Sequence, residues 1–107
     1  MVMPYDATAE FDRIRREVGI LETAQPDRAV KVRLARTSGS RSRTEEAVLF
    51  RITLRYVARE PELWVVLADA RLGLAFERRW SPADMELANG GIRRAGVWPR
   101  VDFVDAR

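Results

Sequence analysis

Any chemistry in this chain has to come from carboxylates and arginines, because its 107 residues include no histidine and no cysteine. Histidine is the usual general base near neutral pH, and cysteine supplies thiol nucleophiles and zinc ligands. What remains is carboxylate acid–base catalysis, or oxygen ligands for Mg²⁺ or Ca²⁺. The sequence contains no glycine-rich phosphate loop, calcium-loop pattern or serine nucleophile elbow that would direct those groups to a reaction.

Three carboxylates are the candidates for catalysis. Asp69 lies in a mostly apolar run, and Asp84 and Glu86 follow farther along the chain. Their spacing does not require them to meet, and Asp69 has a structural explanation as the cross-strand ion-pair partner of Arg51. We therefore predict a protein that is not an enzyme and that uses no cofactor and no metal. A small carboxylate-dependent enzyme, or a binder of an apolar ligand between Trp64 and Tyr56, is the remote alternative.

The basic residues are almost all arginine. Of the 19 basic residues 18 are arginine, against 16 acidic ones, which gives a net charge of +3. Arginine makes bidentate contacts with carboxylates and phosphates, so this bias favours an anionic partner, although arginine-rich codon usage would give the same composition. The longest apolar run, residues 63–68, is far too short to cross a bilayer. We expect one cytoplasmic domain over residues 1–107, with no membrane partner.

The first half of the chain predicts a helix and a hairpin. Apolar residues spaced by three and four predict a helix over residues 8–21, with Asp6 or Thr8 as its cap. Alternation predicts strands over residues 30–35 and 48–57. Between them, residues 37–44 belong to a predicted polar loop of about nine residues. The second strand should place one set of side chains on a common face: Val48, Phe50, Ile52, Leu54 and Tyr56.

The second half is less uniform. Residues 61–72 fit a strand or a helix, and the sequence Trp64-Val65-Val66 favours a strand after a turn at residues 59–62. A short strand over residues 74–80 follows. Ser81-Pro82-Ala83-Asp84 and Asn89-Gly90-Gly91 have the start and stop residues of a second helix. Pro99 confines the tail, residues 97–104, to an edge strand.

These elements predict an α+β fold. An N-terminal helix packs on a three- to four-stranded antiparallel sheet, which a short second helix and a C-terminal edge strand follow. The sheet face turned away from the first helix is left open. That face combines basic side chains with Thr53, Val57, Val65 and Leu67, and the arginines of the polar loop extend it. The candidate binding surface consists of Lys31, Arg33, Arg36, Arg41, Arg43, Arg51 and Arg55.

The leading hypothesis is a non-catalytic protein–protein interaction module, a small adaptor, inhibitor or assembly protein. It would bind an acidic partner through this basic face and the arginine-bearing loop. The partner is either another protein or a second copy of the chain in a homodimer. A nucleic-acid-binding module that uses the same residues is the alternative, because phosphate binding also requires clustered cations.

Overall fold

One helix and six strands make up the secondary structure of the described residues. The computed structural model describes residues 5–71, 73–93 and 100–106, with side chains except at positions 36–38. The predicted α+β architecture, with an N-terminal helix and an antiparallel sheet, is confirmed, and so is the strand predicted after Trp64. In chain order the elements are α1 (Ala7–Ala24), β1 (Arg28–Ser38), β2 (Arg41–Val57), β3 (Glu60–Asp69), β4 (Ala75–Arg79), β5 (Met85–Arg93) and β6 (Asp102–Ala106).

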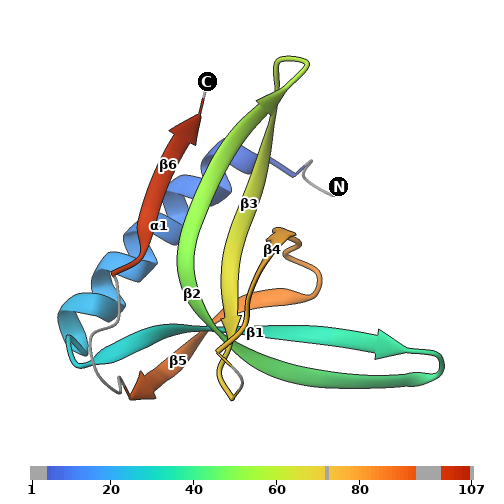
Figure 1. Cartoon of the computed structure of the whole chain (residues 1–107). Helices are drawn as coiled ribbons and strands as arrows, with labels where there is room; N and C mark the ends of the chain where they lie inside the picture. The colour runs from blue at the N-terminus through green and yellow to red at the C-terminus, as the bar shows by residue number, and fades with distance from the viewer. Residues whose placement is uncertain (1–4, 72, 94–99, 107) are drawn as a thin grey trace.

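The sheet is organised around β2, its longest strand. The strand order is β4-β3-β2-β1-β5, with antiparallel neighbours throughout. β1 pairs with β2 only as far as Val48, and β6 then runs parallel to β2 beside Arg51–Arg55. Figure 1 shows the result: the β1–β2 and β2–β3 hairpins project in different directions, and β2 belongs to both. The predicted tail strand is thus present as β6, while residues 97–99, including Pro99, lie outside the described residues.

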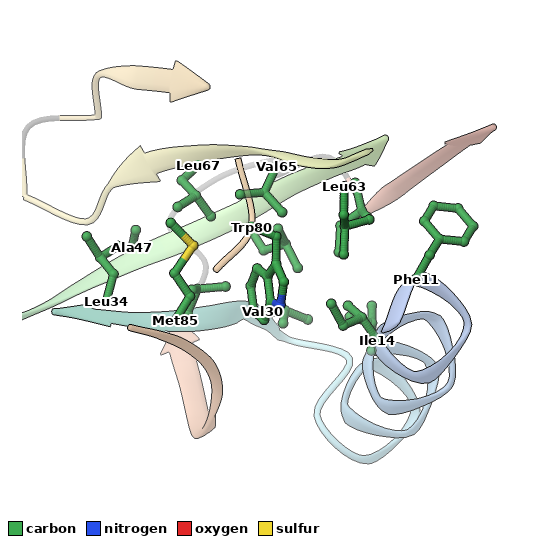
Figure 2. Close-up of a cluster of buried hydrophobic side chains, with 14 of the residues drawn as sticks. Phe11, Ile14, Val30, Leu34, Ala47, Leu63, Val65, Leu67, Trp80 and Met85 are labelled. Atoms are coloured by element: carbon green, nitrogen blue, oxygen red, sulfur yellow. The ribbon is translucent and has the colours of Figure 1, made fainter. Parts of the chain in front are cut away.

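The helix closes one end of the core. Asp6 caps α1, as predicted, by accepting a 3.1 Å hydrogen bond from the Ala9 amide. The apolar stripe of α1 is buried against the sheet, and the Phe11 ring packs edge-on against Phe103 of β6, with 5.6 Å between the ring centroids. In Figure 2, Ile14 of α1 lies beside a core in which side chains of β1 face those of β3. The sheet therefore curls far enough to supply two walls of the core.

A β-bulge in β2 changes which of its side chains face the main core and which face outward, relative to the prediction. The register with β3 shifts between Leu49 and Arg51, so Phe50 is an extra residue. Leu49 and Ile52 both belong to the main core, whereas the simple alternation had placed them on opposite faces. Val48 lies in a second, smaller cluster with Ala29 and Ala68, against which Phe50 packs. The expected common face from Val48 to Tyr56 is therefore wrong before the bulge and correct after it.

The β2–β3 turn is shorter than predicted. It consists of Ala58 and Arg59 alone, since Val57 pairs with Glu60. This register buries Val65 and Leu67 in the main core, so placing them on the open face was wrong. It likewise overturns the predicted alignments of Arg51 with Asp69 and of Arg55 with Val65. The observed register pairs are Arg51–Val66, Arg55–Glu62 and Ala47–Asp69.

Relieving the β2–β3 turn should stabilise the protein. Ala58 and Arg59 have φ angles of 49° and 70°, a left-handed conformation that suits Asn-Gly in a two-residue hairpin turn. We expect the double variant Ala58→Asn/Arg59→Gly to raise the free energy of unfolding by roughly 1–2 kcal/mol, measured by urea denaturation. Arg59→Ala, which removes the same charge but keeps a Cβ atom, should give no such gain. An equal gain from that control would assign the effect to charge.

The predicted second helix is absent from the described residues. Ser81 does begin a turn, because its carbonyl oxygen accepts hydrogen bonds from the amides of Asp84 and Met85. The chain then continues as β5 along the edge of β1, where an antiparallel ladder with one register shift pairs the backbone groups that face β1. The Gly91 position has no room for a side chain, since a Cβ atom would lie 2.2 Å from the Ala29 carbonyl oxygen. Gly91 thus permits a close strand approach instead of ending a helix.

Adding one methyl group at Gly91 should destabilise the fold. Gly91→Ala forces the backbones of β5 and β1 apart, with an expected loss of about 1–3 kcal/mol in the free energy of unfolding. Gly19→Ala is the matched control, because its Cβ atom meets nothing within 4 Å and the site is in α1. That control should be neutral or stabilising by up to roughly 1 kcal/mol. Thermal unfolding of both variants measures the contrast, and equal melting temperatures would refute the close-approach explanation.

Candidate binding surface

Four of the predicted basic residues do share the outer face of the sheet, the side turned away from α1. Lys31 and Arg33 lie on β1, and Arg51 and Arg55 lie on β2 beyond the bulge. Each of these four cations forms an ion pair with a carboxylate that lies on a different strand. The ion pairs are Lys31–Glu46 at 3.1 Å, Arg33–Glu86 at 3.0 Å, Arg51–Asp102 at 3.6 Å, and Arg55–Glu77.

The outer face is therefore compensated in charge. A further pair, Arg79–Glu62 at 3.3 Å, extends the pattern to β4. The Arg55 guanidinium also lies over the Trp64 ring, 4.9 Å from its centroid, and the Trp64 indole N–H donates to Glu62 at 3.2 Å. Each exposed pair contributes well under 1 kcal/mol to folding, but together the acids cancel the positive potential of this face. The sequence identified the cations and missed their partners, because only the register reveals which carboxylates face them.

The remaining arginines lie on a separate structure, the β1–β2 arm, which we define as residues 35–44. The predicted nine-residue loop is mostly strand: the ladder continues to Ser38–Arg41, and only Gly39 and Ser40 form the turn. Gly39 has a φ of 63°, which glycine adopts without strain. β5 pairs with β1 no farther out than Leu34, so the arm extends beyond the body as a two-stranded ribbon (Figure 1).

The arm concentrates positive charge. Residues 35–44 contain Arg36, Arg41 and Arg43 and no acidic residue. Arg36 and Arg43 are direct register partners in the backbone ladder. Arg41 is exposed and makes no ion pair with any described side chain, and the Arg43 side chain is 77% exposed although it contacts Glu45 at the base of the arm.

The seven candidate residues thus form two groups. Residues that are register partners point to the same face of the sheet. Arg43 points to the same face as the core residue Ala47, whereas Lys31 and Arg33 point to the opposite face. The arm does not extend the basic stripe of the sheet, as the sequence suggested. One group is ion-paired across the outer face, while the other projects on the arm.

The three candidate catalytic carboxylates either have structural contacts or lie apart from one another. Asp69 ends β3, where its Oδ1 atom accepts a 2.8 Å hydrogen bond from the Arg71 amide. Glu86 pairs with Arg33, and it lines a shallow hollow of about 230 Å³ together with Asp84, whose Oδ1 atom is buried without a hydrogen-bond partner. Asp69 lines a different hollow, of about 540 Å³, between the arm base and the β3–β4 turn. These positions give no paired acid and base.

Other ligand sites receive little support from the geometry. The predicted apolar pocket between Trp64 and Tyr56 is wrong, since Trp64 is on the outer face and Tyr56 packs against the main core. Burial and the nearby Glu10 carboxylate raise the pKa of Tyr5 to about 12, so this phenol stays protonated at neutral pH. Within residues 5–71, 73–93 and 100–106, no three acidic side chains converge as metal ligands.

Comparisons with protein-family models, with curated proteins and with solved structures give no match. In the described part of the chain, no helix combines the length and the apolar character needed to cross a membrane.

The outer-face ion pairs should contribute modestly and in a salt-dependent way. Glu77→Lys removes the partner of Arg55 and adds a cation beside it, so we expect a loss of about 0.5–1 kcal/mol in the free energy of unfolding at low salt. High salt should reduce that loss. Glu60→Lys, an exposed acid at the hairpin end, makes the same charge change and should have little effect. Urea denaturation at two salt concentrations tests this, and a salt-independent loss would contradict it.

Proposed function

We propose that the protein is a non-catalytic protein–protein interaction module whose β1–β2 arm binds an acidic surface of its partner. The observation that supports this most directly is the uneven distribution of charge. The cations of the outer face already have carboxylate partners, whereas the arm carries three arginines and no acid over residues 35–44. Among the described side chains, Arg41 has no ion-pair partner and Arg43 has Glu45 alone, so an acidic partner would supply further counter-charges to the arm.

Arginine is suited to this role. Its planar guanidinium binds a carboxylate through two parallel hydrogen bonds and is weakly hydrated, so it loses less on desolvation than lysine does.

An acidic protein fits the charge distribution better than a nucleic acid. A nucleic acid follows a surface over several phosphates, and the carboxylates on the outer face, such as Glu46, Glu86 and Asp102, would repel it. The arm alone offers at most three phosphate contacts, which corresponds to weak binding with a log–log salt slope of about −3. A protein partner needs only the short arm.

The arm proposal can be tested with an acidic probe. We expect wild-type protein to bind a poly-glutamate peptide at low salt, and Arg41→Glu/Arg43→Glu to weaken this binding about tenfold, or roughly 1.4 kcal/mol. Arg33→Glu/Arg51→Glu makes the same change in net charge on the outer face and should leave the affinity within about twofold. Fluorescence anisotropy measures the affinities, and circular dichroism checks the fold of each variant.

Two results would overturn the proposal. Equal losses in the two double variants would assign the binding to net charge and not to the arm. Tight binding of duplex DNA or RNA, with a steep salt slope that the arm variant abolishes, would make the protein a nucleic-acid-binding module instead.

A further inference from the structure

The arm has an unpaired backbone edge as well as the exposed arginines Arg41 and Arg43. Along β2, residues 41–46 pair with β1 alone, and the ladder with β3 begins at Ala47. Within the part of the chain that the structure describes, no strand therefore lies beside the opposite edge of β2 over these six residues. A two-stranded ribbon is only marginally stable by itself, and a third strand would add backbone hydrogen bonds and stiffen it.

The turn determines which backbone groups this edge presents. Ser38 and Arg41 flank a two-residue turn, so they form the hydrogen-bonded pair that closes the hairpin. Hydrogen bonding alternates along an antiparallel strand, so the N–H and C=O groups of every second residue point away from β1. On β2 the outward-pointing residues are Ser42, Thr44 and Glu46.

The side chains around the edge have a defined charge order. Arg41 and Arg43 project on one face of the strand toward the tip, and Ser42 and Thr44 alternate with them. At the base, carboxylates collect around the hollow of about 540 Å³, which Arg43–Glu46 border on one side and Asp69–Arg71 on the other. Arg71 lines the same hollow and Glu45 is paired with Arg43, so the edge changes from basic at the tip to mixed charge at the base.

From these features, we propose that the acidic partner binds as an added β-strand along the free edge of β2, residues 41–46. This rests on the proposed function of the arm. The matching segment is extended, with two acidic residues separated by one small polar residue to face Arg41 and Arg43. A basic residue two positions away lies opposite Glu45, at the border of the hollow. Backbone pairing supplies affinity, and the alternating charges set the register.

A second copy of the chain fits this edge less well. Symmetric antiparallel pairing about Thr44 sets Arg43 against Glu45 of the other copy, which is favourable in charge. It also directs the tip of the other arm toward the position opposite Ala47, which Asp69 of β3 already occupies. A short peptide segment ends before that point.

Proline substitutions separate backbone pairing from side-chain attraction. Ser42→Pro and Thr44→Pro remove outward N–H groups and leave the hydrogen bonds to β1 in place. We expect each to weaken binding of a peptide with the pattern Lys-Thr-Glu-Thr-Glu about tenfold. Ser42→Ala and Thr44→Ala keep the N–H groups and should bind as wild type does.

Amide hydrogen exchange gives a second readout in the unmodified protein. In the free protein the amides of Ser42, Thr44 and Glu46 should exchange fast, and the peptide should protect them. The amides of Arg41 and Arg43, which point toward β1, should already be protected without it.

The outcomes distinguish the two proposals. If the arginine variants lose binding while the proline variants bind normally, with no new amide protection, the arm binds through side chains and strand addition is refuted. If neither set loses binding, both proposals fail. A concentration-dependent dimer in light scattering that the proline variants abolish would make a second copy the occupant of the edge, which would overturn the proposal of an external acidic segment.

Discussion

The structure depends on how β2 distributes its hydrogen bonds. One strand of 17 residues has to pair with β1 at its beginning, with β3 at its end, and with β6 where β1 has left it. A flat strand could not pair with all three of these neighbours and also keep its apolar side chains in the core that α1 covers. The bulge at Phe50 bends β2, so that Leu49 and Ile52 can both enter the main core. Curling of the sheet, closure by α1 and projection of the arm all follow from that bend.

The same bend explains the distribution of charge. Beyond the bulge the odd-numbered residues of β2, such as Arg51 and Arg55, lie on the outer face, where acids of β4 and β6 reach them. Before the bulge the odd-numbered positions, such as Arg43, lie on the opposite face. A regular strand would have gathered these arginines on one surface. The change of phase separates the ion-paired cations of the outer face from Arg41 and Arg43 on the arm, of which only Arg43 has an ion-pair partner among the described side chains, Glu45.

Local patterns in the sequence were sufficient for some elements and insufficient for others. The stripe on α1 and the alternation after Phe50 each lie within one element, and both predicted it correctly. The length of the β2–β3 turn and the bulge each shift the register by a small amount, and such a shift exchanges the faces of a whole strand. Residues 82–89 have helix-start and helix-stop chemistry, but an open edge on β1 offers an antiparallel ladder, and tertiary pairing overrides that preference. The ion-pair partners could not be predicted from the sequence either, because they depend on which strands pair and in which register.

The coincidence of exposed charge and unpaired backbone in the arm has a physical basis. Beyond Leu34 and Ala47 none of the described side chains of either strand belongs to the main core, so burial no longer selects apolar side chains at those positions. Small hydroxyl residues and arginines keep the ribbon extended and soluble, but they do little to stabilise it. The body needs only the first part of β1 and the rest of β2 to close its core. The exposed cations Arg41 and Arg43 and the unpaired strand edge, which contribute nothing to the described core, are the features on which the proposed contact with another molecule rests.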